Sequence, residues 1–220
     1  MTDSSSLTLG AIFYPGFELL DTFGPLEMFG NVGPGLRIAT IAEQAGEVRS
    51  AQGPRVLAKH GFADAPECEL LLLPGGVGTF QQLENADLLG FLKERSRGAR
   101  AVMSVCSGSA LLARAGLLDG QRATSNKQFF DLARAQSGAV DWVEEARWVE
   151  DGPWFTSSGV SAGMDMALAV IERLFGNDRA LEIADLTEYE WHRDPDRDPF
   201  VRCLNQGDAA AFAPPDTSAC

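Results

Sequence analysis

Short apolar runs alternate with segments of helical periodicity along most of the chain. The apolar runs are typical of buried strands, and they cover residues 7–13, 36–42, 69–73 and 101–105. In the other segments apolar residues recur about every three to four positions, as on one face of a helix. These segments cover residues 18–30, 80–96, 107–118, 160–176 and 177–190. Such alternation predicts an α/β fold with a mostly parallel sheet covered by helices on both faces.

Two segments depart from this alternation. Residues 146–158 predict a β-hairpin that turns at Asp151-Gly152, and residues 55–62 predict an antiparallel excursion. The end of the chain is rich in small residues and proline. We therefore expect one domain over residues 1–204 and a disordered tail over residues 205–220.

Composition and charge narrow the classes of partner. Apolar residues make up 45% of the 220 positions and charged residues 22%, as in a globular protein. The 31 acidic and 18 basic residues give a net charge of -13, which repels nucleic-acid phosphates and anionic lipid surfaces. The N-terminal region carries neither a basic segment followed by an apolar run nor a run of membrane-spanning length. We expect a cytoplasmic protein that binds neither nucleic acid nor membrane.

The cysteines and histidines do not form a metal-binding pattern. Cys68, Cys106, Cys203 and Cys220 are widely and irregularly spaced, and there are two histidines in the chain. These spacings match neither a disulfide framework nor a zinc site. Reduced thiols and no metal are therefore expected.

Cys106 is the candidate nucleophile. It stands between the apolar run 101–105 and a helical segment that begins without a connecting loop, which predicts a sharp strand-to-helix turn relieved by Gly108. The amides at the start of that helix would lower the pKa of the thiol and favour the thiolate. The alternative is a buried structural cysteine, which is the usual state of a free cysteine. We assign that role to the other three cysteines.

Gly75 and Gly76 are candidate oxyanion donors. They follow the strand predicted over residues 69–73, and their unhindered N–H groups would lie beside that of Ser107 at the same sheet edge. An ordinary turn is the alternative for a Pro-Gly-Gly sequence.

Asp21 is the candidate acid or base, because no histidine adjoins Cys106. It lies among apolar residues just after the first predicted strand, where burial would raise its pKa and let it hold a proton. The alternative is an N-cap of a helix over residues 23–30.

Four segments together resemble the ThiJ/PfpI superfamily, and within it the isocyanide hydratases. They read FYPGFELLDTFGPLEMF, LLLPGGVGT, AVMSVCSGSALLARAGLLDGQRAT and WFTSSGVSAGMDMALAVIERLFG. The resemblance implies a flavodoxin-like three-layer fold, a homodimer, a cysteine nucleophile at Cys106 and a paired acid at Asp21. Isocyanide hydratases carry a threonine after the cysteine, and this chain has another hydroxyl residue, Ser107, at that position. Protease-like members of the family carry a histidine at the same position, so the resemblance does not imply peptidase activity.

The chain departs from the family pattern after Thr124. Many relatives continue with Thr-His-Trp, whereas this sequence reads Ser125-Asn126-Lys127. Asn126 is our candidate there for contact with a substrate or oxyanion. Near the end of the chain, Trp191 and His192 would cover either a pocket or a dimer partner, or form a helix end and a surface turn.

These residues predict a hydratase that converts an isocyanide into an N-substituted formamide through a thioimidate, with no metal or organic cofactor. Cys106 would attack, Asp21 would move protons, and Ser107 with Gly76 would orient the intermediate. One alternative is glyoxalase III-like conversion of methylglyoxal, for which relatives use a glutamate or histidine base. The other is a non-catalytic redox or ligand sensor that uses Cys106.

Overall fold

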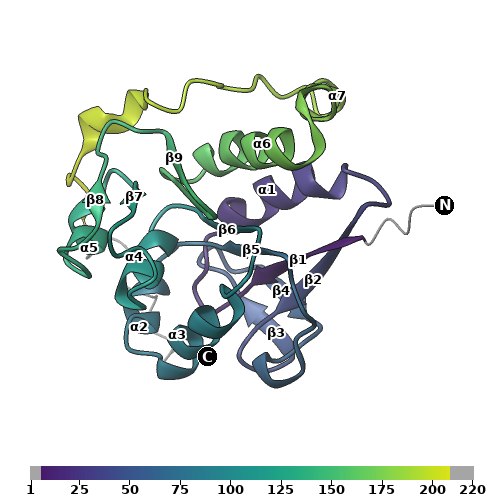
Figure 1. The fold of residues 1–220 in the computed structure, drawn as a ribbon. Helices are drawn as coiled ribbons and strands as arrows, with labels where there is room; N and C mark the ends of the chain where they lie inside the picture. The colour runs from purple at the N-terminus through teal and green to yellow at the C-terminus, as the bar shows by residue number, and fades with distance from the viewer. Residues whose placement is uncertain (1–5, 209–220) are drawn as a thin grey trace.

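The central element is a six-stranded sheet. A computed structural model describes residues 6–208 of the chain. The strands lie in the order β2 (Leu36–Ile41), β1 (Leu7–Ile12), β5 (Leu70–Leu73), β6 (Ala101–Ser104), β10 (Trp154–Ser157) and β9 (Trp148–Asp151) (Figure 1). All neighbours pair in parallel except β9, which runs antiparallel to β10. The predicted mostly parallel sheet and the hairpin turning at Gly152 are both confirmed.

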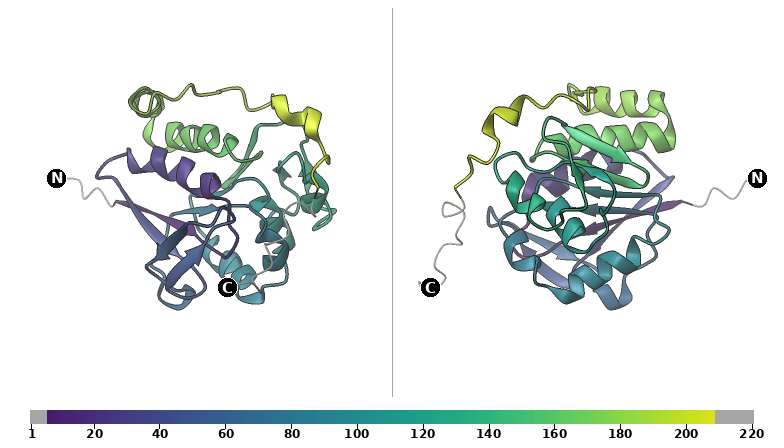
Figure 2. Two further views of the ribbon diagram at one scale, coloured as in Figure 1. Left: turned by 180° about the vertical axis from the view of Figure 1, so that it is seen from behind. Right: turned by 60° about the vertical axis from the view of Figure 1, so that its left-hand side comes forward.

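Helices cover both faces of the sheet. One layer contains α1 (Leu19–Gly30), α6 (Ala162–Phe175) and α7 (Asn177–Leu186). The other contains α2 (Thr79–Gln82), α3 (Ala86–Arg95) and α4 (Gly108–Arg114). The two views of Figure 2 show the sheet between these layers. This arrangement is the flavodoxin-like three-layer fold.

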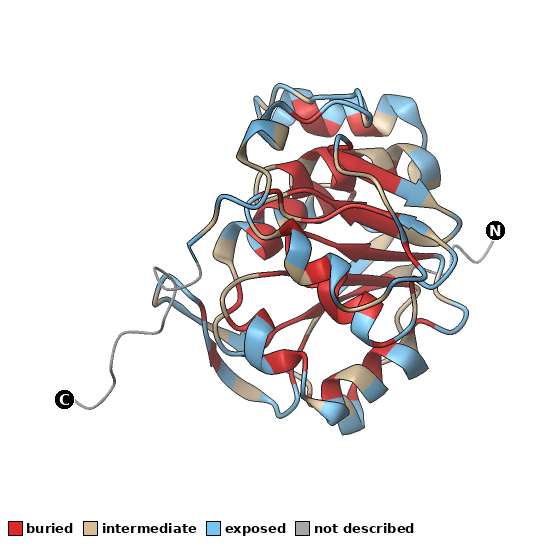
Figure 3. Ribbon diagram, turned by 90° about the vertical axis from the view of Figure 1, so that its left-hand side faces the viewer, coloured by how far each residue is buried: buried red, intermediate tan, exposed pale blue. Residues whose placement is uncertain are grey.

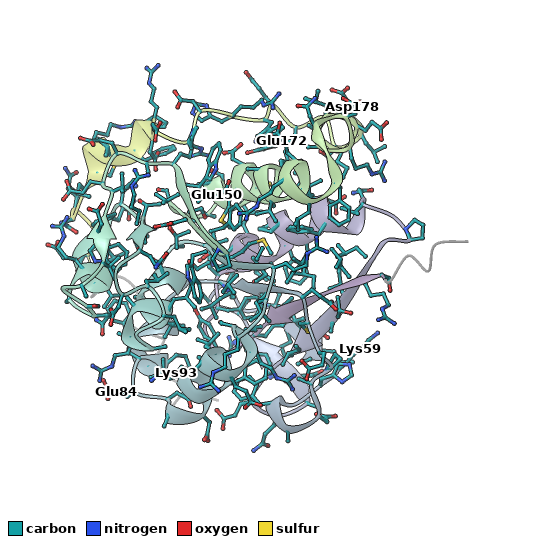
Figure 4. All side chains as sticks on the ribbon, viewed as in Figure 1. Lys59, Glu84, Lys93, Glu150, Glu172 and Asp178 are labelled. Atoms are coloured by element: carbon teal, nitrogen blue, oxygen red, sulfur yellow. The ribbon has the colours of Figure 1, made fainter. Side chains whose placement is uncertain are left out.

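The wholly apolar β5 shows why the sheet needs both layers. Leu70 and Leu72 pack into the core beneath α1 and α6, whereas Leu71 and Leu73 pack into the core on the side of α3 and α4. All four leucines are fully buried, because successive side chains of a strand point to opposite faces. Figure 3 shows the buried strands between exposed outer helix surfaces. Charged side chains such as Lys93 on α3 and Asp178 on α7 lie on those outer surfaces (Figure 4).

Three helices end or break earlier than the apolar periodicity predicts. The segment 80–96 is two helices, because the Asn85 side chain accepts hydrogen bonds from the Asp87 and Leu88 amides and caps α3. The helix expected over residues 107–118 ends at Arg114, and the one expected over residues 177–190 ends at Leu186. Apolar periodicity continues beyond each of these ends because the following residues still pack on the core.

The predicted antiparallel excursion pairs with a strand that the sequence did not reveal. Strand β4 (Arg55–Ala58) forms a two-stranded sheet with β3 (Gly46–Arg49). The hairpin is held against the loop between β1 and α1, because the Ala51 amide donates to the Phe17 carbonyl at 2.8 Å. Further short elements were also not predicted: β7 (Arg122–Ala123), β8 (Asp141–Trp142), α5 (Phe130–Arg134) and the 3-10 turns Phe62–Asp64 and Pro199–Cys203.

After α7 the chain crosses the molecule to reach α5 and β8 (Figure 1). The buried Asp198 lies 3.8 Å from the buried Lys127 ammonium group. Beyond it, the Asn205 amide donates to the Lys127 carbonyl, and the Asn205 side chain accepts from the Asp131 amide. The first residues of the predicted tail are therefore bonded to the domain, and residues 209–220 lie outside the described residues.

Candidate active site

Cys106 occupies a strained turn at the end of β6. Its φ angle is +57°, a left-handed conformation that costs a non-glycine residue energy. Its N–H donates to the Ser158 carbonyl at 3.2 Å. A Cβ at Gly108 would lie 2.7 Å from the Leu73 carbonyl oxygen, so only glycine fits there. The predicted strand-to-helix elbow is confirmed.

Three adjacent strand ends bring the other predicted residues to this turn. Asp21 follows β1, Gly75 follows β5 and Cys106 follows β6, and these strands are neighbours in the sheet. A Cβ at Gly75 would lie 2.5 Å from the Ser107 nitrogen and 3.0 Å from the Cys106 Cβ. The absence of a side chain at Gly75 is therefore what lets the two loops touch.

Asp21 is fully buried in the first turn of α1. Its Oδ2 accepts a hydrogen bond from the Gly75 N–H at 2.8 Å. None of the described residues lies in hydrogen-bonding geometry with its Oδ1. Burial raises the pKa of this carboxyl from 3.8 to about 8, against the lowering effect of the Gly75 hydrogen bond. The charge of Glu18 contributes a smaller part of this rise in pKa, and contact with the Cys106 thiol acts against it. Asp21 thus holds a proton at neutral pH, and the alternative N-cap role is wrong because α1 already begins at Leu19.

The Cys106 thiol is not the low-pKa group predicted from the sequence. Burial raises its pKa above the usual value, and the neighbouring Asp21 carboxyl raises it further. The Ser107 N–H and the Asn126 amide, which donates to Sγ at 3.0 Å, lower it by less. The Ser107 N–H at the start of α4 is the part of this helix that stabilises the thiolate, and burial outweighs its effect. The prediction failed because the sequence does not reveal how deeply the sulfur lies.

Ser107 belongs to a chain of hydroxyl groups. Its Oγ lies 2.9 Å from the Thr79 Oγ1, which in turn lies 3.1 Å from the Tyr14 hydroxyl. Tyr14 donates to the Pro74 carbonyl at 2.6 Å. Because each hydroxyl has one proton, Thr79 must donate to Tyr14, and Ser107 must donate to Thr79. The Ser107 proton is therefore directed into the protein, and its oxygen accepts the Gly76 N–H at 3.1 Å.

The two predicted oxyanion donors are already engaged. The Gly75 N–H is bonded to Asp21, and the Gly76 N–H donates to the Ser107 Oγ at 3.1 Å. In this structure these amides position the acid and the hydroxyl and do not form an open oxyanion hole. The sequence placed both glycines at the site but gave no information about where their N–H groups point.

A cavity of about 160 Å³ opens beside Cys106. An apolar cavity of about 150 Å³ in another protein holds a benzene molecule, so the space accommodates a ring of that size. Phe80 and Phe129 meet edge to face at 6.4 Å between ring centres. The described lining residues are Glu18, Gly76, Val77, Phe80, Cys106, Ser107, Asn126, Gln128, Phe129, Leu132 and Val160. Asn126, singled out from the sequence, is among them.

Several other residues lie away from this cavity. Among the described residues, neither histidine lines it. Trp191 and His192 instead bind α6, because the Trp191 indole donates to the Asp165 carbonyl and the His192 amide to the Asp165 carboxylate. Cys68 and Cys203 are half-buried free thiols outside the cavity, and Cys220 lies outside the described residues.

Sequence reasoning missed Glu18, Tyr14 and Thr79. Tyr14 directly follows the first predicted strand, Glu18 begins the helical segment predicted over residues 18–30, and Thr79 lies three residues after the Pro-Gly-Gly loop. Position at the carboxyl edge of a parallel sheet was the available signal. Within residues 6–208 there is no group of three or more His, Cys, Asp or Glu side chains that could hold a metal ion, and none of the described helices is long and apolar enough to span a membrane.

Comparison with known proteins agrees with this geometry. Residues 10–173 match the model of the DJ-1/PfpI family. An isonitrile hydratase of Pseudomonas putida is 33% identical over 184 residues, which cover 84% of this chain and 79% of that protein. The HTH-type transcriptional regulator GbdR of Pseudomonas aeruginosa is 32% identical over 80% of this chain and 50% of its own length.

One solved structure is similar to this chain in both fold and sequence. The crystal structure of a THiJ/PfpI family protein from Pseudomonas syringae has a TM-score of 0.77 and 33% sequence identity, and the match covers 84% of this chain and 76% of that one. The family match, the sequence relatives and the fold agree. This chain belongs to the DJ-1/PfpI family.

Proposed function

We propose that this protein is a cysteine-dependent hydratase that adds water to an isocyanide and releases an N-substituted formamide. The observation that carries the proposal is the pairing of Cys106, on its strained turn, with the buried and protonated Asp21 carboxyl. A hydroxyl residue, Ser107, stands beside them. The 33% identity to an isonitrile hydratase gives independent support.

The reaction begins with addition of the Cys106 thiol to the terminal carbon of the isocyanide. The sulfur–carbon bond forms, the carbon receives the Asp21 proton, and the thiol proton returns to Asp21. The product of this step is a thioimidate. A neutral carboxylic acid suits the step because it donates one proton and accepts another without leaving a buried charge.

Water then completes the hydration. It attacks the thioimidate carbon, the nitrogen gains one proton, and the sulfur leaves with the other as the formamide carbonyl forms. Ser107 lines the cavity, and its oxygen, which already accepts the Gly76 N–H, has one lone pair left to accept a hydrogen bond from the attacking water. The apolar walls at Phe80 and Phe129 suit a small alkyl or aryl substituent on that nitrogen.

The test is formamide production from para-nitrophenyl isocyanide by the purified protein. Cys106→Ala removes the nucleophile, and we expect the rate to fall to the uncatalysed value. Asp21→Asn keeps the shape but holds no exchangeable acid proton, and we expect a loss of about 100-fold or more. Cys68→Ser is the matched control, because this thiol is half-buried outside the cavity. Equal rates in the wild type and Cys106→Ala would overturn the proposal.

Ligand sensing is a second candidate, and the similarity to the regulator GbdR is the observation that favours it. A sensor would bind a small molecule in the Cys106 cavity without turnover. Saturable binding of the isocyanide to Cys106→Ala, together with the absence of formamide from the wild type, would support this second function over the first.

A further inference from the structure

Glu18 places a carboxylate at the Cys106 cavity. It immediately precedes α1, lines the cavity and is half-buried. Its backbone is fixed by the glycine loop, because its N–H donates to the Gly75 carbonyl at 2.9 Å. The mechanism described above does not use this side chain.

Gln52 holds the Glu18 carboxylate in place. Its Nε2 donates to the Glu18 Oε2 at 2.6 Å, and its Oε1 accepts the Leu19 amide at 3.1 Å. Gln52 lies on the loop between β3 and β4, the hairpin anchored beside Phe17. Because the partner is a neutral amide, the contact fixes the carboxylate without neutralising it.

Glu18 is therefore a charged residue in the lining of an otherwise uncharged cavity. Of its described lining residues, Glu18 and Cys106 are the ionisable ones, whereas Ser107, Asn126 and Gln128 are neutral. The field of Glu18 reaches the reactive groups, since its charge raises the pKa of both Asp21 and Cys106. Apolar walls keep water from screening that field fully.

We propose that Glu18, positioned by Gln52, selects substrates by charge: it admits neutral and cationic electrophiles to Cys106 and repels those that carry a carboxylate. For isocyanides this inference rests on the proposed hydratase function. The part of the inference that concerns access to the Cys106 thiol does not depend on that function, and it applies to any electrophile that enters the cavity.

The first experiment compares two thiol reagents that differ in charge. Iodoacetamide and iodoacetate alkylate sulfur by the same reaction, in which the sulfur–carbon bond forms, iodide leaves and the thiol proton is released. The rate at Cys106 is followed by peptide mass spectrometry, and glutathione gives the intrinsic ratio of the two reagents. A change in thiol pKa alters both rates equally, so the ratio reports the charge of the cavity alone.

We expect Glu18→Gln to raise the iodoacetate rate relative to the iodoacetamide rate by about 5- to 10-fold, as for one charge a cavity's width from the reagent. The effect should shrink as salt is added, and Gln52→Ala should change the ratio in the same direction by less. Glu27→Gln, on the exposed side of α1, is the matched control. A ratio in Glu18→Gln equal to that of the wild type would overturn the inference.

The second experiment uses substrates. Glu18→Gln should raise kcat/KM for 4-isocyanobenzoate relative to para-nitrophenyl isocyanide by a similar factor. If the wild type hydrates neither compound, the proposed hydratase function fails, whereas the alkylation ratio still decides whether Glu18 selects by charge.

Discussion

Replacement of Asp21 by asparagine tests the central electrostatic feature of the site, a carboxyl group kept neutral by burial. Folding raises the pKa of Asp21 from 3.8 to about 8. The two pKa values differ by about four, and each step of one corresponds to ~1.4 kcal/mol, so ionising Asp21 costs on the order of 6 kcal/mol more in the folded protein than in the unfolded chain. Asparagine has nearly the same shape but carries no charge at any pH.

The sign follows from the direction of the pKa change. Because the folded protein binds the Asp21 proton more tightly than the unfolded chain, stability from this group is fully present below about pH 4. It is lost as the pH rises toward about 8. The free energy of unfolding of Asp21→Asn minus that of the wild type should therefore increase by about 1.4 kcal/mol per pH unit across this window. Above the window the difference should be constant.

Urea unfolding of both proteins at pH 5, 7 and 9, followed by tryptophan fluorescence, measures this difference. Any fixed cost of placing an amide in the site is the same at each pH and cancels from the slope. Asp141→Asn, at an exposed position, is the control. A repeat in the Cys106→Ser background removes the titration of the thiol. A flat difference for Asp21→Asn between pH 5 and 9 would refute the neutral carboxyl and with it the proton source in the proposed mechanism.

Two further substitutions test the hydroxyl chain and the glycine loop. Thr79→Val leaves the Ser107 hydroxyl without its acceptor, so we expect formamide production to fall and the free energy of unfolding to drop by about 1–3 kcal/mol. Thr79→Ser should restore both. A wild-type rate for the valine variant would contradict the proposed chain of hydroxyl groups. Gly75→Ala forces a methyl group to within 2.6 Å of the Ser107 Oγ, so urea unfolding should show a free energy of unfolding lower by about 1–3 kcal/mol, together with lost activity. Gly90→Ala, whose added methyl group meets open space, is the control. Equal stability of the two alanine variants would argue against the close approach of the two loops.

The layers of the fold were predictable because they depend on local patterns. Wholly apolar runs such as that of β5 specify strands buried on both faces, and the lack of a loop after residue 105 specifies the turn at Cys106. The break between α2 and α3 was missed although Asn85 is a strong N-cap residue, because apolar periodicity continues through it. Strand β3 was missed because it lies on the small hairpin and has one buried residue, Val48.

The composition of the site was predictable, but its hydrogen bonding was not. Asp21, Gly75 and Cys106 follow strands that any parallel sheet would bring to one edge. What each group donates or accepts depends on tertiary approach, such as the 2.8 Å contact between the Gly75 N–H and Asp21. The thiol pKa depends in the same way on burial, which a single sequence does not state.

This hydrogen bonding bears on the class of reaction. Amides that point into an open pocket would stabilise an oxyanion, the charge that develops when a nucleophile attacks a carbonyl group. Here the Gly75 and Gly76 amides are bonded to Asp21 and Ser107, and the acid they hold is neutral near pH 7. Such a site is better arranged to deliver and recover protons than to bind negative charge, and the carboxylate of Glu18 strengthens that preference. Addition of water to an isocyanide needs protons at both carbon and nitrogen, and its first step forms no oxyanion, so this reaction would use the neutral acid of the site. Attack on methylglyoxal would instead place a negative oxygen where the Gly75 and Gly76 amides are already occupied.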